Sequence, residues 1–201
     1  ASGGSRRAIR RAFSRDAMDL ETVKEQYRDR VISASTLSYA DMSQVDLSYA
    51  DLSYADLSKA DLSKVDLSYA NLRDVDLREA DLSKADLSYS NLRGANLSYA
   101  NLREADLSKV DLSYANLREA DLRGVDLRGA NLRGANLREA DLRGVDLRGA
   151  NLRDIDLREA DLRETDLRVF QAGAWVAYLT ATHIQIGCQM HPIDVWKGFS
   201  S

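Results

Sequence analysis

The chain has 201 residues, of which 44% are apolar and 30% are charged, and its formal net charge is −4. This length suits one domain with a core of its own, and so small a net charge gives no sign of a nucleic-acid or membrane partner. The single cysteine excludes an internal disulfide framework. Because the chain has neither a signal-peptide pattern nor an apolar run of about 18 residues, we expect a cytoplasmic protein.

Residues 1–34 are predicted to form an N-terminal α-helical cap. Residues 1–5 resemble the remainder of a cleaved expression tag. Apolar side chains then recur at three- and four-residue steps from Ile9 to Val31, which is typical of an amphipathic helix. Helix starts at Ser14 and Asp19 leave one bent helix or two helices open. Four arginines lie where the helix dipole disfavours positive charge, so we favour a lid with a frayed start over a basic arm for nucleic acid or lipid. These are Arg6, Arg7, Arg10 and Arg11.

Residues 35–168 repeat with a period of five. Leucine returns at every fifth position from Leu37 to Leu167, and only Met42 interrupts the series of 27 units. From the second unit on, aspartate or asparagine directly precedes this residue, and a small or β-branched residue precedes it by two positions. A period of five fits neither the 3.6 of a helix nor the 2.0 of a strand. We therefore predict an all-β solenoid, in which each unit buries its apolar face by stacking on its neighbours.

The same pattern predicts which positions face inward. The leucine and the small residue should line the interior, and the other three residues of each unit should face solvent. Aspartate and asparagine suit the corner between units, because their short side chains bond nearby backbone amides. Each buried leucine should contribute about 1.5–3 kcal/mol to the free energy of unfolding, so the stability is expected to come from a long leucine ladder.

The motif A-[D/N]-L-X-X, as at residues 50–54 (ADLSY), resembles the pentapeptide-repeat proteins across 133 of the 201 residues. The resemblance implies a right-handed quadrilateral β-helix with four pentapeptides per coil and hence about seven coils. The residues themselves support this coil length only weakly, because asparagine pairs at a spacing of 20 barely outnumber those at 15. One column at a spacing of 20 consists of aspartate throughout: Asp46, Asp66, Asp86, Asp106, Asp126, Asp146 and Asp166.

The outward positions follow an unexpectedly simple rule. From Ser38 to Glu164, outward serine is followed by tyrosine or lysine, apart from Ser43-Gln44, and arginine is followed by glutamate, aspartate or glycine. Serine units crowd the N-terminal half, whereas arginine units fill residues 118–168. So small a set of residues, without an insertion, favours a consensus-derived or engineered sequence.

Two outward columns are candidate sites. Stacked carboxylates such as Asp46 and Asp66 would repeat every ~4.8 Å, close to the separation in a retaining glycosidase. A turn-forming role is favoured, because no histidine or unique residue accompanies them. Tyr49, Tyr69 and Tyr89 could stack into an exposed aromatic ladder, but we favour surface β-forming residues that cover the sheet face.

Residues 169–201 leave the repeat and are predicted to form a C-terminal cap. Without a cap, the last coil would expose leucines and unpaired backbone groups. Residues 182–186 alternate as a strand does, and Pro192 is expected to open a short helix.

The only cluster of metal-ligand residue types also lies in this segment. Cys188 and His191 have ligand spacing, but a zinc site needs a second strong pair. A nucleophile made of the same two residues lacks an orienting third group. We therefore predict no catalytic, cofactor-binding or metal site and no cofactor. The cluster comprises His183, Cys188, His191 and Asp194.

These observations predict a non-enzymatic structural scaffold without a small-molecule substrate, direct nucleic-acid contact or membrane contact, either monomeric or a cap-mediated homodimer. The resemblance keeps two alternatives open: a gyrase-binding DNA mimic and a bacterial protein-interaction module with a protein partner. Residues 36–168 carry 26 acidic and 19 basic side chains, a net charge of −7. That balance disfavours the DNA mimic, because its arginine-rich half should then be strongly acidic.

Overall fold

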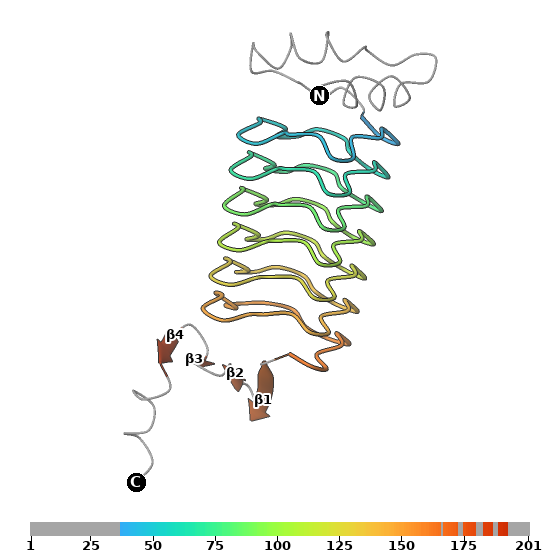
Figure 1. Ribbon diagram of the computed structural model, residues 1–201. Helices are drawn as coiled ribbons and strands as arrows, with labels where there is room; N and C mark the ends of the chain where they lie inside the picture. Colours follow the sequence, from blue (N-terminus) through green and yellow to red (C-terminus); the bar gives the residue numbers. More distant parts are fainter. Residues whose placement is uncertain (1–36, 166, 173–174, 180–182, 187–188, 193–201) are drawn as a thin grey trace.

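The computed structural model describes residues 37–165, 167–172, 175–179, 183–186 and 189–192. Residues 37–165 wind into a stack of closely similar coils, one above another along a single axis (Figure 1). The predicted helical cap at residues 1–34 lies outside the described residues.

Four pentapeptides make one coil. Parallel bridges join every aspartate or asparagine of the repeat to its equivalent four units later, from Asp41 with Asp61 to Asp141 with Asp161. This is the coil length that the resemblance implied. The all-β solenoid prediction is confirmed.

All five backbone N–H groups of a pentapeptide are hydrogen-bonded, as residues 66–70 illustrate. Three N–H groups bond carbonyls of the neighbouring coils, one bonds the side chain of the unit's own aspartate, and one closes a β-turn within the unit. Every donor is therefore satisfied by the coil itself or by an adjacent one. The bonds run from Asp66 to Val45 O (3.0 Å), Leu67 to Asp86 O (2.7 Å), Ser68 to Asp66 Oδ1 (3.0 Å), Tyr69 to Ser88 O (3.0 Å) and Ala70 to Leu67 O (3.1 Å).

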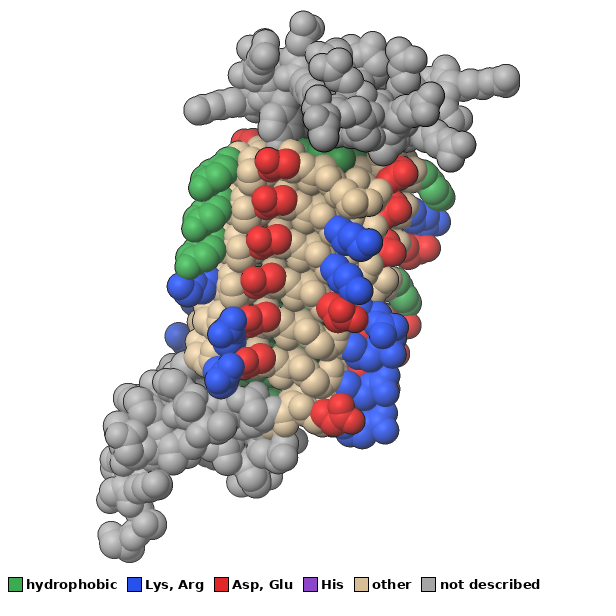
Figure 2. Space-filling view, in the orientation of Figure 1, with side chains coloured by type: hydrophobic (Ala, Val, Ile, Leu, Met, Phe, Trp, Pro, Cys, Tyr) green, Lys and Arg blue, Asp and Glu red, His purple; other side chains and the backbone are tan. Residues whose placement is uncertain are grey.

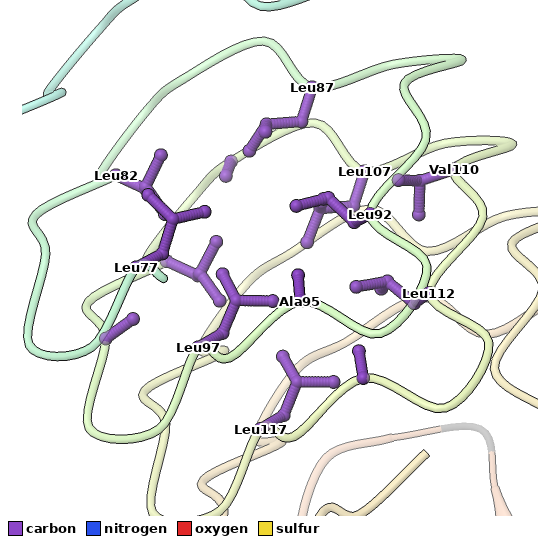
Figure 3. Close-up of a cluster of buried hydrophobic side chains, with 14 of the residues drawn as sticks. Leu77, Leu82, Leu87, Leu92, Ala95, Leu97, Leu107, Val110, Leu112 and Leu117 are labelled. Atoms are coloured by element: carbon purple, nitrogen blue, oxygen red, sulfur yellow. The ribbon is translucent and has the colours of Figure 1, made fainter. Parts of the chain in front are cut away.

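The interior holds two residues from each unit, as predicted. The leucines from Leu52 to Leu152 expose no more than 2% of their surface, and the small residues between them expose no more than 3%. Figure 3 shows Leu77, Leu97 and Leu117 projecting into the same interior from three successive coils. The buried hydroxyl of Ser90 donates to the Leu87 carbonyl at 2.7 Å, so a polar residue at this position is accommodated.

Each unit is numbered so that its aspartate or asparagine is the second residue. The fifth residue of the unit then takes a left-handed backbone conformation. Within the described residues, 20 non-glycine residues have φ between 54° and 64°, and the six positive-φ glycines fall at the same position of the repeat. A positive φ at the third residue of a β-turn normally favours glycine. The prediction that Tyr49, Tyr69 and Tyr89 are β-forming residues on the sheet face is therefore wrong. They occupy turns at the corners, because the hydrogen bonds between coils impose that conformation whatever the side chain.

The chain beyond the coils forms a four-stranded antiparallel meander in the order β1-β2-β3-β4. Its strands are β1 (Arg168–Ala172), β2 (Trp175–Leu179), β3 (His183–Ile186) and β4 (Gln189–Pro192). The strand predicted over residues 182–186 is confirmed as β3 at residues 183–186, and residue 182 lies outside the described residues.

Pro192 does not open a helix at its own position. It ends β4, where it pairs with His183, and residues 193–201 lie outside the described residues. A proline is tolerated in an edge strand because it has no N–H group to contribute to a hydrogen-bond ladder. Within the described part of the chain, no helix has the length and apolar character needed to span a membrane.

We predict that Leu102→Asp unfolds the solenoid or splits it, whereas Tyr99→Asp changes its stability little. Leu102 is fully buried, so the first substitution removes leucine packing and places a carboxylate among apolar side chains, at a cost of more than about 4 kcal/mol. Tyr99 is 52% exposed and occupies a turn position that aspartate takes at residue 74. Thermal unfolding followed by circular dichroism compares the two variants. Equal losses would mean that the inward and outward positions are wrongly assigned.

A second prediction concerns the side chain that accepts the in-unit N–H bond. Asp106 accepts the Ser108 N–H at 2.8 Å, so Asp106→Ala should lower the free energy of unfolding by about 1–2 kcal/mol. Asp106→Asn should be close to neutral, because asparagine accepts the equivalent bond elsewhere in the repeat, as Asn91 does from Arg93 N–H at 3.2 Å. Urea unfolding of both variants at neutral pH provides the comparison. A similar loss in both would show that the negative charge, not the acceptor oxygen, matters at this position.

Candidate functional site

The outward side chains form columns along the solenoid, because each residue lies against its equivalent in the next coil. Two of these columns lie on one face, and Figure 2 shows a continuous row of acidic side chains beside a shorter row of hydrophobic ones. One column consists of bridged aspartates and is called the aspartate column: Asp46, Asp66, Asp86, Asp106, Asp126 and Asp146. The stacked residues Tyr49, Tyr69 and Tyr89 form another, which we call the tyrosine ladder.

In the N-terminal half, the aspartate column is hydrogen-bonded to serine. Asp46 Oδ1 accepts both the Ser48 backbone N–H at 3.0 Å and the Ser48 hydroxyl at 2.7 Å. The hydroxyl bond and then the backbone bond hold the pKa of Asp46 below its ordinary value, because both favour the carboxylate. The Asp46 carboxylate therefore stays ionised and stabilises the turn of its own unit.

In the C-terminal half, arginine replaces serine at the same position. Arg128 Nε donates to both Asp126 oxygens at 2.9 Å and 2.8 Å, and its Nη2 donates to Oδ2 at 2.5 Å. Its Nε also lies 3.9 Å from Oδ2 of Asp146 in the next coil. The hydrogen bond from Arg128 is the main cause that lowers the pKa of Asp126, and desolvation opposes it. The column therefore changes from an anionic strip to a row of ion pairs along its length.

Asparagine side chains link neighbouring coils in a different column. Asn91 Nδ2 donates to Asn71 Oδ1 at 3.2 Å, and Asn71 Nδ2 donates to Asp51 Oδ1 at 2.9 Å. Each amide thus bonds its equivalent in the preceding coil while its own oxygen accepts an in-unit N–H, as from Arg73 to Asn71 at 3.4 Å. Such amide ladders add coil-to-coil bonds that aspartate pairs cannot make.

The tyrosine ladder is present, although the residue pattern favoured the other interpretation. The rings of Tyr49 and Tyr69 stack with centroids 5.0 Å apart, and those of Tyr69 and Tyr89 with centroids 4.9 Å apart. Their planes differ by only 5° and 7°. All three rings remain accessible, exposing 74%, 49% and 45% of their surface along the series.

Sequence reasoning missed Lys109, which ends the ladder. Its Nζ donates to the Tyr89 hydroxyl at 2.6 Å and lies 4.8 Å from the ring centroid, a cation–π contact. Lys109 is the equivalent of Tyr89 one coil later. If the residues alone had established the coil length, they would have predicted this contact.

The sequence predicts no metal site at the cluster of His183, Cys188, His191 and Asp194. Cys188 and Asp194 lie outside the described residues, and His183 and His191 belong to the paired strands β3 and β4. Among the residues that the structure describes, no group of three histidine, cysteine, aspartate or glutamate side chains is arranged to hold a metal ion.

We predict that acid destabilises the solenoid. Arginine bonds lower the pKa of several carboxyl groups, and that of Asp161 falls from 3.8 to about 2, chiefly through its bond from Arg163. A carboxyl whose pKa is lower in the folded state stabilises fully above its unfolded pKa, and the contribution is lost as the pH falls through the folded pKa. The melting temperature should therefore stay level above pH ~4 and fall toward pH ~2.

A triple variant tests the cause of this acid sensitivity. Asp121→Asn, Asp141→Asn and Asp161→Asn together keep the oxygen that accepts the in-unit N–H and remove three carboxyl groups that titrate at low pH. The variant should lose less of its melting temperature between pH ~5 and pH ~2 than the unmodified protein does. Equal losses would show that these ion pairs do not cause the acid sensitivity.

Comparison with known proteins agrees with this geometry. The pentapeptide-repeat family model matches in eight copies, over residues 32–63, 60–98, 90–129, 100–138 and 135–168. No curated protein matches the chain.

Several solved structures are similar. The fluoroquinolone-resistance protein QnrB1 is 22% identical over 65% of this chain and 78% of its own, with a TM-score of 0.45. The pentapeptide repeat protein alr5209 from Nostoc is 45% identical over 50% of this chain and 83% of its own, with a TM-score of 0.43. HetL, a Nostoc protein involved in heterocyst differentiation regulation, is 29% identical over 74% of this chain and 94% of its own, with a TM-score of 0.21. Since the family model matches most of the sequence, the chain belongs to the pentapeptide-repeat family.

Proposed function

We propose that the chain is a non-enzymatic β-solenoid scaffold with a consensus-derived or engineered sequence. The observation that carries this proposal is the use of the outward polar groups. In unit after unit, the aspartate oxygen accepts the N–H group of the residue two positions later, and serine or arginine side chains bond the same carboxylate. These groups hold the coil together.

The acid–base character of the carboxylates supports the same proposal. A general acid needs a carboxyl with a raised pKa, so that it carries a proton near neutral pH. The shifts run the other way here, because hydrogen bonds from Ser53 and Arg78 lower the pKa values of Asp51 and Asp76. Carboxylates that stay charged and bonded suit a structural role.

Ion pairs between coils give a physical reason why an outward arginine is followed by an acidic residue in many units. Arg118 Nη2 lies 2.9 Å from Glu119 and 3.1 Å from Glu139, the residue at the same turn position one coil later. Arginine followed by an acidic residue thus creates pairs both within a coil and between coils. Repeating such pairs at equivalent positions is the outcome expected of a consensus or a design procedure.

The DNA-mimic alternative requires a much larger negative charge. At a coil spacing of ~4.8 Å, duplex DNA carries about three charges per coil height. The repeat has an excess of seven negative charges over 27 units, or roughly one per coil of four units. Ion pairs such as Arg143 with Asp141, at 2.6 Å, reduce the negative field further where arginine is most frequent.

A gyrase supercoiling assay with the purified protein separates the two functions. We expect no inhibition at high micromolar concentration, because the charge density is too low for mimicry. Potent inhibition would overturn the scaffold proposal and favour the DNA mimic.

A more acidic variant serves as the matched control in that assay. Arg123, Arg128, Arg143 and Arg148 are changed to serine, the residue that earlier coils carry in the same two columns. Inhibition by this variant alone would show that the arginines keep the unmodified protein from acting as a mimic, in agreement with the proposal. If the unmodified protein inhibits gyrase and the more acidic variant inhibits it no more strongly, the charge argument is contradicted.

A further inference from the structure

The tyrosine ladder is a preorganised aromatic surface. Its three rings keep nearly parallel planes at successive spacings of 5.0 Å and 4.9 Å. Each ring belongs to a turn residue with φ between 59° and 61°, so the backbone directs all three side chains alike. A ligand that binds along the ladder would therefore have little side-chain entropy to remove.

The chain itself shows what the rings attract. Lys109 places its ammonium group 4.8 Å from the centroid of Tyr89 at one end of the ladder. Two further cations lie over tyrosine rings elsewhere, Lys59 over Tyr39 at 5.4 Å and Arg93 over Tyr114 at 5.7 Å. The exposed tyrosines of this solenoid thus accept positive charge on their faces.

The aspartate column adds negative charge in the same three coils. Asp46, Asp66 and Asp86 belong to the same units as the tyrosines, and the residue two positions after each is serine. Arginine takes that position only later, where it pairs with Asp126 and Asp146. Figure 2 shows the acidic row running beside the hydrophobic row, with basic side chains next to it only further along. The tyrosine ladder and the three aspartates beside it therefore form a strip that is both aromatic and anionic.

We propose that this strip binds a planar aromatic cation, which lies parallel to the solenoid axis along the tyrosine ladder. The ligand would pack against the exposed edges of rings at a regular spacing of about 5 Å, and its positive charge would face the aspartates. This binding activity goes beyond the scaffold function, which requires no ligand.

Thioflavin T, an elongated planar cation, is a suitable probe, titrated into the full chain and followed by fluorescence and equilibrium dialysis. We expect saturable binding of one molecule per chain. Tyr69→Asn, which removes the middle ring, should weaken binding about tenfold. Asparagine tolerates a positive φ, so the turn should survive the substitution. Circular dichroism checks that it does.

Tyr99→Asn is the matched control for the ladder. Tyr99 has the same turn conformation and a similar exposure, 52% against 49% for Tyr69. Its neighbours in the column are Glu79 and Glu119, and its hydroxyl donates to Glu119 at 2.9 Å. This variant should bind the probe as the unmodified protein does. Equal affinities in the two variants, or no saturable binding by the unmodified protein, would overturn the proposal.

The charge requirement is tested separately. Asp66→Asn should weaken binding about three- to fivefold at low salt, and the difference should shrink at about 0.5 M salt. Asp81→Asn is its control, because Asp81 also bonds a serine N–H, from Ser83 at 2.9 Å, but its unit carries Lys84 instead of tyrosine. Equal weakening by both substitutions would mean that the probe responds to net charge alone, and would contradict a site at the ladder.

Discussion

The structure depends on one requirement: each pentapeptide must find a partner for all five of its N–H groups. Neighbouring coils supply three carbonyls, the turn supplies one, and the aspartate or asparagine side chain supplies the last. A buried or half-buried amide without a partner would cost about as much as a lost hydrogen bond. The side-chain acceptor explains why this position of the repeat admits only two residue types from Asp41 to Asp166.

The same hydrogen bonds impose a left-handed conformation on residues that do not favour it. Twenty non-glycine residues adopt positive φ among the described positions, each at a cost on the order of 1 kcal/mol or more. Burial of a leucine and a small residue in every unit offsets this strain. The strain also fixes the direction of the outward side chains, because the backbone at every corner has nearly the same conformation.

Because the corners are regular, the outward side chains form columns along the solenoid. The contacts between outward side chains are therefore best described column by column. Like residues one coil apart stack, as Tyr49, Tyr69 and Tyr89 do, and unlike residues pair, as Arg118 does with Glu139. A substitution therefore acts on its own residue and on the residues one coil above and below. Changing one tyrosine interrupts the ladder, whereas changing one serine to arginine neutralises a stretch of the aspartate column.

The five-residue period by itself determined the solenoid, its interior and its exterior, because burial of leucine and alanine follows a local pattern that every unit repeats. It also indicated the aspartate bond to a nearby backbone amide, which joins positions close together in the chain. The tertiary structure decided which outward residues contact one another. A coil of three or of four pentapeptides buries the same leucines, and only the bridges between Asp41 and Asp61 and their equivalents establish that Tyr49 lies against Tyr69. The positive φ of the tyrosines likewise follows from hydrogen bonds between coils, which no single pentapeptide can reveal.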